Sequence, residues 1–126
     1  MLVNNLDHLV ITVYDITASC LFYEKVLGLE ILLFDDDRKA LRVGDQKINL
    51  HQAGLERTPH AKHPTPGSAD LCFITDRLIS DYVNHLGTCG VDIELGPVKR
   101  YGAHGQMDSV YFRDPDGNLL EVSHYV

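Results

Sequence analysis

The stretch that decides the fold is LDHLVITVYDITASCLFYEKVLG, residues 6–28. Its first part, Leu6–Val13, alternates between polar and apolar positions with the period of two that a β-strand requires, and His8 lies on the less apolar side. Asp15 suits the N-cap of a helix, an apolar stripe follows at helical spacing, and Gly28 suits the C-terminal cap. The stretch therefore predicts a strand followed by a helix.

The same order of elements occurs twice along the chain. After the helix, strand patterns are predicted at Leu29–Phe34, Lys39–Val43 and Lys47–Gln52. A proline-rich linker at 54–68 precedes a second series: a strand at Ala69–Thr75, a helix capped by Asp76, and strands at Val91–Leu95, Gln106–Phe112 and Asn118–Tyr125. We therefore expect two β-α-β-β-β modules, at about 5–53 and 69–126, within one domain.

Neither module is large enough to bury both faces of its strands by itself. The fold class expected is thus α+β, with eight strands in one cupped, mixed sheet and the helices on its outer face. Apolar pairs such as Leu120 and Val122 are expected to face the helices. The polar residues between them are expected to line the hollow, and they are His8, Asn49, His51, Asp70, Glu121 and Ser123.

Composition limits the function. Eleven Lys and Arg against 18 Asp and Glu give a formal charge of −7, which disfavours nucleic acid and anionic membrane surfaces as partners. No apolar run approaches the ~20 residues that span a bilayer, and no signal peptide is evident. Three cysteines without a CxxC spacing give neither a complete disulfide framework nor a zinc motif. The composition therefore favours a soluble, acidic, cytoplasmic domain.

Three segments carry a resemblance to a known family: DHLVITV at 7–13, FYEKVLGLE at 22–30 and, most specifically, YFRDPDGNLLEV at 111–122. Over essentially its whole length the chain resembles the vicinal oxygen chelate superfamily, which includes glyoxalase I, fosfomycin-resistance proteins and extradiol dioxygenases. The resemblance implies a homodimer. It also implies a divalent metal, with nickel, zinc, manganese and iron all left open, held by one side chain from the first and last strand of each module. Mapped onto this sequence, the metal ligands are His8, His51, Asp70 and Glu121.

Two of these ligands depart from the glyoxalase pattern. Glyoxalase-like members usually carry a Glu where this chain has His51, and a His where it has Asp70. Proton transfer is expected at Glu121, with His51 as an alternative base, because an imidazole titrates near neutral pH. Substrate contacts are expected from side chains that alternate on one face of the penultimate strand, namely Ser109, Tyr111 and Arg113.

By resemblance, the leading expectation is a metal-dependent lyase of the glyoxalase I type, which isomerises a thiol adduct of a 2-oxoaldehyde. A dioxygenase is the second hypothesis, with His8, His51 and Glu121 as the two-histidine, one-carboxylate triad of iron enzymes. A thiol transferase like the fosfomycin-resistance proteins and a metal-free binding module also stay open. Lys99 and Arg100 either attract an anionic substrate or belong to a solvated loop.

Overall fold

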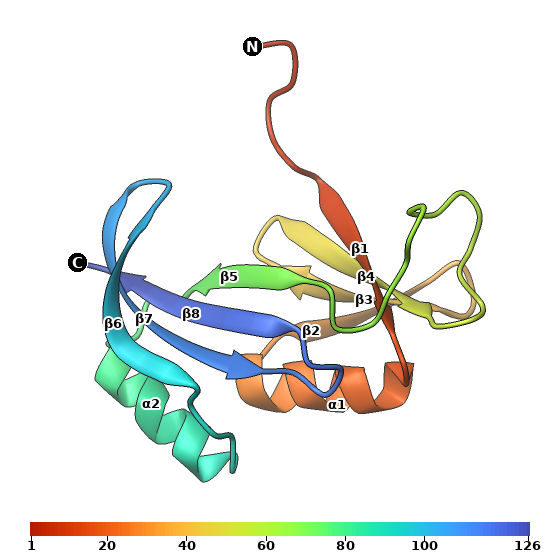
Figure 1. Ribbon diagram of the computed structural model, residues 1–126. Coiled ribbons are helices and arrows are strands. Elements are labelled where there is room, and N and C mark those ends of the chain that lie inside the picture. Colours follow the sequence, from red (N-terminus) through yellow and green to blue (C-terminus); the bar gives the residue numbers. More distant parts are fainter. The chain divides into compact units, whose positions relative to one another are not determined.

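The computed structural model describes residues 1–126, which form two compact modules, Met1–Pro66 and Gly67–Val126 (Figure 1). The first contains β1 (His8–Val13), α1 (Ile16–Leu27), β2 (Glu30–Phe34), β3 (Arg38–Val43) and β4 (Gln46–Gln52). The second contains β5 (Asp70–Ile74), α2 (Ile79–Thr88), β6 (Leu95–Gly102), β7 (Gly105–Arg113) and β8 (Leu119–Tyr125). The α+β class and the repeated β-α-β-β-β order are confirmed.

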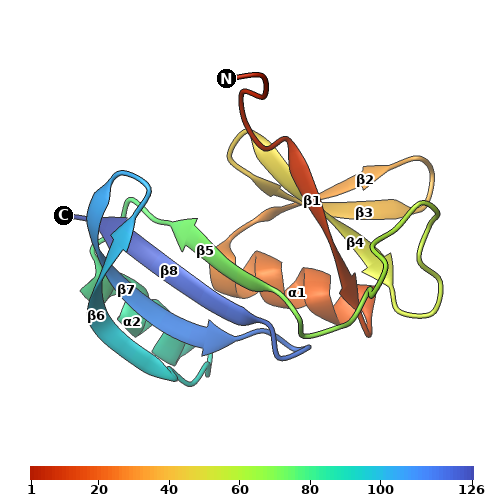
Figure 2. The ribbon, with the colours of Figure 1, turned by 45° about the horizontal axis from the view of Figure 1, so that its top comes forward.

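Each module forms its own four-stranded mixed sheet, so the eight strands are hydrogen-bonded as two sheets in place of one continuous sheet. The strand order is β1-β4-β3-β2 in the first module and β5-β8-β7-β6 in the second (Figure 2). In both, the first and last strands are parallel neighbours, and the remaining pairs are antiparallel. The two modules therefore share one topology, which places equivalent strand positions in equivalent surroundings.

The helix of the first module begins and ends where its sequence predicts. The Asp15 carboxylate accepts a hydrogen bond from the backbone N–H of Ala18 at 3.1 Å, which satisfies one of the free donors of the first turn. Gly28 ends the helix in the left-handed region at φ 68°, where a residue without a Cβ is favoured.

Two expectations for the second module are wrong. Helix α2 has Leu78 and not Asp76 at its N-cap, because residues 75–77 form a turn in which the Arg77 N–H donates to the Thr75 hydroxyl. The strand expected at Val91–Leu95 lies instead at Leu95–Gly102, where it pairs with β7. Pairing in this hairpin outweighs the weak strand propensity of its lysine, arginine and glycines.

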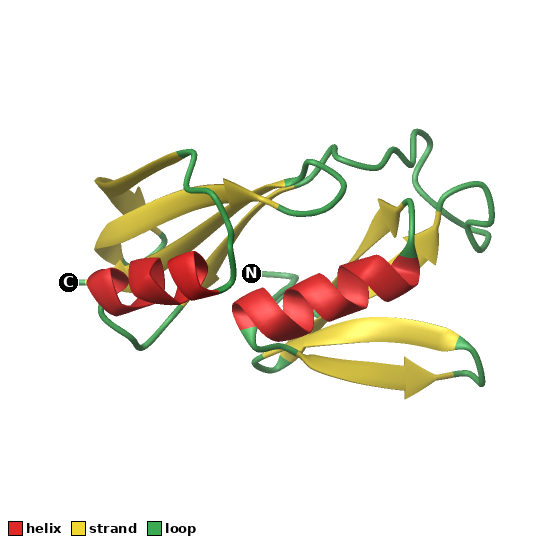
Figure 3. Cartoon of the chain, turned by 90° about the horizontal axis from the view of Figure 1, so that it is seen from below, coloured by secondary structure: helices red, strands yellow, loops and turns green.

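Each sheet carries its core on the face that its own helix covers (Figure 3). The buried apolar residues include Ile11, Val13, Leu41, Ile48 and Leu50 in the first module and Phe73, Val110, Phe112, Leu120 and Val122 in the second. The helix-facing positions predicted from alternation are thus confirmed for β4 and β8, and the opposite face is left for polar side chains. Neither helix has the length and apolar character needed to cross a lipid bilayer.

Candidate functional site

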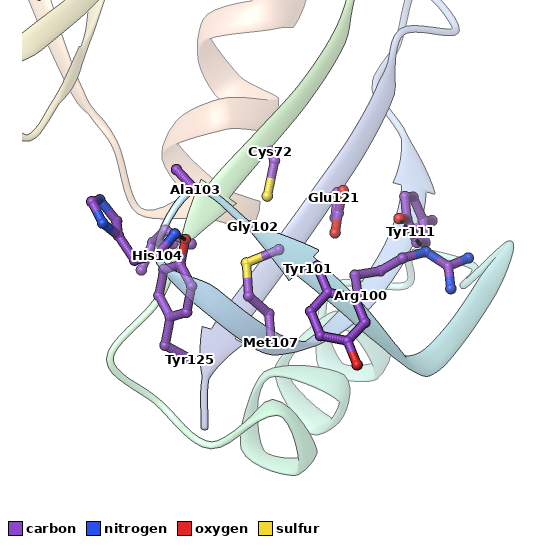
Figure 4. Close-up of a pocket in the computed structure, with 11 residues that line it drawn as sticks. Cys72, Arg100, Tyr101, Gly102, Ala103, His104, Met107, Tyr111, Glu121 and Tyr125 are labelled. Atoms are coloured by element: carbon purple, nitrogen blue, oxygen red, sulfur yellow. Dashed lines mark hydrogen bonds between the residues drawn. The ribbon is translucent and has the colours of Figure 1, made fainter.

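A pocket of about 430 Å³ lies in the second module, on the sheet face opposite the apolar core (Figure 4). Three adjacent strands supply its central residues in register: Cys72 of β5 lies opposite Glu121 of β8, which lies opposite Tyr111 of β7. The full lining is Cys72, Ile74, Arg100, Tyr101, Gly102, Ala103, His104, Met107, Tyr111, Glu121 and Tyr125. The pocket therefore combines one carboxylate, one thiol and one guanidinium with several aromatic rings.

Glu121 occupies the middle of this arrangement, between Cys72 and Tyr111 (Figure 4). The Ser123 hydroxyl donates a hydrogen bond to its Oε2 atom at 3.1 Å. Its carboxylate also interacts with the Tyr111 hydroxyl. Glu121 is thus a half-buried, oriented carboxylate that faces a cavity, which is the placement that a general base needs.

The buried pair Ser109 and Ser123 supports Glu121 from below the pocket. Their hydroxyl oxygens are 2.6 Å apart, and neither residue is exposed. Each serine hydroxyl has a single proton. Because Ser123 donates its proton to Glu121, Ser109 must be the donor within the pair. Ser109 lies on the sheet face expected for it, but it does not line the pocket. Its hydroxyl contacts Ser123, so it is not positioned to contact a substrate.

Tyr111 is the one substrate-contact candidate that lines the pocket. Arg100 reaches it from β6: its Nε donates to the Tyr111 hydroxyl oxygen at 3.0 Å, and the guanidinium lies 5.4 Å from the ring centre. Burial raises the pKa of the Tyr111 hydroxyl, the hydrogen bond from Arg100 acts in the opposite direction, and Glu121 adds to the rise. The Tyr111 hydroxyl is therefore protonated at neutral pH and available as a donor.

Arg113, the third candidate, has a structural partner. Its Nε and Nη2 atoms donate to the two carboxylate oxygens of Glu94 at 2.8 and 2.9 Å, and its Nη1 donates to the carbonyl of Gly117 at 3.1 Å. The forked geometry matches a carboxylate well and lowers the pKa of Glu94. Arg113 thus ties the turn after β7 to the segment before β6, and it does not line the pocket.

Cys72 is a pocket residue that the sequence did not single out. Desolvation raises the pKa of its thiol and the charge of Glu121 raises it further, and its Sγ atom lies 3.4 Å from the Ser123 hydroxyl oxygen. The thiol is therefore the form present at neutral pH, and a reactive thiolate is disfavoured.

The candidate metal ligands in the second module are neighbours across two parallel strands. Asp70 lies opposite Leu119, two positions before Glu121 in the register of β5 and β8. Asp70 is exposed and opens β5. The two carboxylates therefore share one sheet face on a diagonal, so that both side chains project in the same direction.

The register of the first module separates its two histidines. His8 lies opposite Lys47, whereas His51 lies opposite Thr12, four residues further along the strand pair. This separation corresponds to roughly 13 Å at the rise of a β-strand. His8 is exposed and hydrogen-bonded to Asp7 at 2.8 Å. His51 is 7% exposed, and burial followed by the charge of Arg38 lowers its pKa. The structure does not bring His8 and His51 together.

Asn49 holds the position that the family resemblance assigned to His51. It stands two positions beyond the residue paired with His8, as Glu121 stands two positions beyond the residue paired with Asp70. Its Oδ1 atom is buried without a hydrogen-bond partner, although the residue is 5% exposed. A buried, unpaired carbonyl oxygen is costly unless something binds it. Alternation had placed Asn49 on the polar face, which was the only signal for it.

These donors suit a divalent metal, since imidazole, amide and carboxylate groups are its usual protein ligands. Within either module by itself, no three His, Cys, Asp or Glu side chains are grouped as a metal site would require. The predicted set of His8, His51, Asp70 and Glu121 draws on both modules. The register of β1 and β4 does not support His8 and His51 as ligands of the same ion, and the combination of either histidine with Asp70 and Glu121 stays a prediction.

Comparison with known proteins finds relatives that match essentially the whole chain. The family model described as Glyoxalase/Bleomycin resistance protein/Dioxygenase superfamily matches residues 5–122. Virulence protein STM3117 of Salmonella typhimurium is 54% identical over the whole chain and 88% of its own length, and its crystal structure superposes with a TM-score of 0.97 over all of both chains. Glyoxalase domain-containing protein RDO1 of Mycosarcoma maydis is 50% identical over 98% of this chain and 69% of its own. Metallothiol transferase FosB of Shouchella clausii is 27% identical over 96% of this chain and 80% of its own.

Proposed function

Because the chain belongs to the glyoxalase/bleomycin resistance protein/dioxygenase superfamily, we propose that it is a divalent-metal-dependent enzyme of the glyoxalase I type. Its substrate is a small molecule that carries oxygens on neighbouring carbons, and its reaction moves a proton between those carbons. The observation that carries the proposal is the placement of Glu121, whose oriented carboxylate faces the pocket of the second module.

The proton transfer is assigned to Glu121. One carboxylate oxygen takes the proton from the first substrate carbon and returns it to the second. The hydroxyl proton on the first carbon passes to the oxygen of the second, so that the hydroxyl and carbonyl groups exchange places and Glu121 ends the reaction as it began. Ser123 holds Oε2, which leaves Oε1 as the oxygen suited to this transfer. The Tyr111 hydroxyl, protonated at neutral pH, orients the substrate or the carboxylate from the neighbouring strand.

The residues proposed to hold the metal are Asp70 and Glu121 in the second module and His8 in the first. A divalent metal would supply positive charge next to both substrate oxygens, which would acidify the C–H bond of the carbon that loses its proton. Glu121 has the two oxygens and the partial exposure that a group with both roles requires. The unpaired Oδ1 of Asn49 is a further oxygen donor in the first module.

The names of two relatives support related chemistry on this fold. RDO1 is described as a glyoxalase domain-containing protein and FosB as a metallothiol transferase. Thiol transfer is therefore the second enzyme reaction to consider, with the same metal requirement. A metal-free binding module is the candidate from another class, and it is favoured by a pocket lining in which aromatic and apolar residues surround one carboxylate.

The test is metal quantification joined to an activity assay. The purified chain is reconstituted with nickel, zinc, manganese or iron, its metal content is measured by mass spectrometry, and turnover of methylglyoxal with glutathione is followed. We expect stoichiometric binding of at least one of these ions, and a loss of roughly 100-fold or more in kcat for Glu121→Gln.

His8→Ala is expected to lower the metal content, whereas His63→Ala, which removes an exposed histidine from the linker before β5, serves as its matched control. Absence of stoichiometric metal and of turnover with all four ions would contradict the enzyme proposal and favour the binding module. Metal binding without methylglyoxal turnover, joined to turnover of another thiol acceptor, would favour the transferase.

A further inference from the structure

Arg100 is a cation without an anionic partner in a pocket of an acidic protein. The chain has a formal charge of −7, and four of its other basic side chains have acidic partners: Arg38 with Asp35, Arg57 with Asp37, Lys99 with Asp108 and Arg113 with Glu94. Arg100 has no carboxylate within salt-bridge distance, although it is half-buried and lines the pocket (Figure 4). A guanidinium in this position is suited to bind an anion that comes from outside the chain.

The guanidinium is held in place before any ligand arrives. Its Nε donates to Tyr111 at 3.0 Å, its Nη1 donates to the Lys99 carbonyl at 3.0 Å, and its plane lies near the Tyr111 ring. These contacts leave the two N–H donors of Nη2 without a partner. Because the side chain is already ordered, little of its rotamer entropy remains to be lost on binding an anion.

The position of Arg100 relative to Glu121 limits the size of the ligand. Tyr111 contacts both residues, so one tyrosine hydroxyl separates the free guanidinium from the proposed base. A substrate whose anionic group binds Arg100 must therefore carry that group within a few bonds of the carbon that faces Glu121.

We propose that Arg100 binds a carboxylate of the substrate, and that the substrate is a small organic acid whose carboxylate lies next to the reacting carbons. The proposal rests on the proposed function for its use of Glu121 as the neighbouring base. A planar, singly charged carboxylate suits the site because Arg100 is the only Lys or Arg among the lining residues. A phosphonate carries more charge and a third oxygen, and the lining offers no second Lys or Arg for it.

The test is binding by NMR to the full-length chain, which requires no turnover. Three probes of similar size are titrated into the isotope-labelled protein: phenyllactate, its neutral amide phenyllactamide, and phenylphosphonate. We expect phenyllactate to bind tightest and to shift the resonances of Arg100, Tyr111 and Glu121. Loss of a charge-assisted pair is expected to weaken phenyllactate binding in Arg100→Gln by roughly 10- to 100-fold.

Two further variants give the test its controls. Arg77→Gln removes the same charge from an exposed position outside the pocket and should bind phenyllactate like the parent chain. Arg100→Lys keeps the charge and should retain a preference for the acid over the amide, which also guards against a folding defect in Arg100→Gln. Equal binding of acid and amide by the parent chain, or unchanged binding by Arg100→Gln, would overturn the proposal. Tighter binding of phenylphosphonate would overturn the assignment to a carboxylate.

The outcome is separable from that of the proposed function. Arg100-dependent binding of phenyllactate without any metal-dependent turnover would uphold the carboxylate site and contradict the enzyme. Metal-dependent turnover of a neutral substrate that is insensitive to Arg100→Gln would uphold the enzyme and contradict the carboxylate site.

Discussion

Ser109 and Ser123 share a hydrogen bond of 2.6 Å although neither residue is exposed to solvent. The pair joins β7 to β8 directly beneath the pocket. The Ser123 hydroxyl also donates a hydrogen bond to Glu121, so the ordered pair fixes the orientation of that carboxylate. A buried hydroxyl pair costs free energy unless both members are satisfied. The pair thus links the stability of the second sheet to the orientation of the proposed base.

Replacing the two serines by alanine should lower the free energy of unfolding by different amounts. Ser123→Ala leaves the Ser109 hydroxyl buried without an acceptor and deprives Glu121 of a donor, so we expect it to lower the free energy of unfolding by about 1–3 kcal/mol. Ser109→Ala leaves Ser123 with Glu121 and Cys72 as partners, so we expect a cost of about 1 kcal/mol or less. Urea denaturation of both variants checks the order. A larger cost for Ser109→Ala would contradict it.

The Cys72 thiol reports on the same network. The charge of Glu121 raises the pKa of this thiol, so Glu121→Gln should lower it. The rate of alkylation by iodoacetamide as a function of pH measures the pKa, in a chain whose other cysteines, Cys20 and Cys89, are replaced by serine. An unchanged or higher pKa of Cys72 in Glu121→Gln would contradict this effect of the Glu121 charge.

Two glycines of β6 should respond differently to the addition of one methyl group. A Cβ at Gly96 would lie 2.6 Å from the backbone oxygen of Ser109, at a φ of +114° that L-residues rarely adopt. A Cβ at Gly102 would meet the ends of the Tyr125 and Met107 side chains, at 2.5 and 2.6 Å, and these ends can move. We expect Gly96→Ala to lower the melting temperature clearly and Gly102→Ala to lower it less while reshaping the pocket wall. Equal losses by calorimetry would contradict this.

The turn after β7 depends on Asn118. Its side-chain amide donates to Asp114 at 2.7 Å, its Oδ1 accepts from the backbone of Ala69 at 2.9 Å, and it is 1% exposed. Asn118→Ala therefore leaves buried groups unpaired, and we expect a loss of about 2–4 kcal/mol in the free energy of unfolding. Asn84→Ala, on the exposed side of α2, is the matched control and should change stability by about 0.5 kcal/mol or less. Denaturant titration distinguishes the two.

Alternation and capping residues were sufficient to predict most elements, because each signal is local. The period of two in β8 placed Leu120 and Val122 toward the core, and Asp15 and Gly28 marked the ends of α1. The start of α2 and the position of β6 could not be predicted, because a turn and a hairpin pairing decide them. From sequence, Lys99 and Arg100 could either attract an anionic substrate or belong to a solvated loop, and only the pairing of β6 with β7 places Arg100 beside Tyr111.

The prediction of the candidate site was limited because the register between neighbouring strands could not be predicted. Alternation identifies the face of a strand but not the residue that lies opposite on its neighbour. His51 and Asn49 share a face, and only the pairing of His8 with Lys47 reveals that Asn49 is the counterpart of Glu121. The same reason explains why Ser109 was expected in the pocket: its face was predicted correctly, but its burial depends on side chains from other strands.

His51 should make the stability of the chain depend on pH in the mildly acidic range. Burial lowers its pKa below the ordinary value of 6.5, Arg38 adds to this effect, and the residue is 7% exposed. Between the lowered pKa and 6.5 the unfolded chain binds more protons than the folded chain, so the free energy of unfolding falls as the pH falls. Above about 6.5 both states hold a neutral imidazole, and the contribution is constant.

In His51→Gln this loss of stability on acidification should be smaller, whereas in His63→Gln, which changes an exposed histidine, it should match the parent chain. Urea denaturation at a series of pH values from about 5 to 7.5 measures both slopes. A slope in His51→Gln equal to that of the parent would mean that other groups carry the pH dependence, and that His51 is as free to protonate in the folded chain as in the unfolded one.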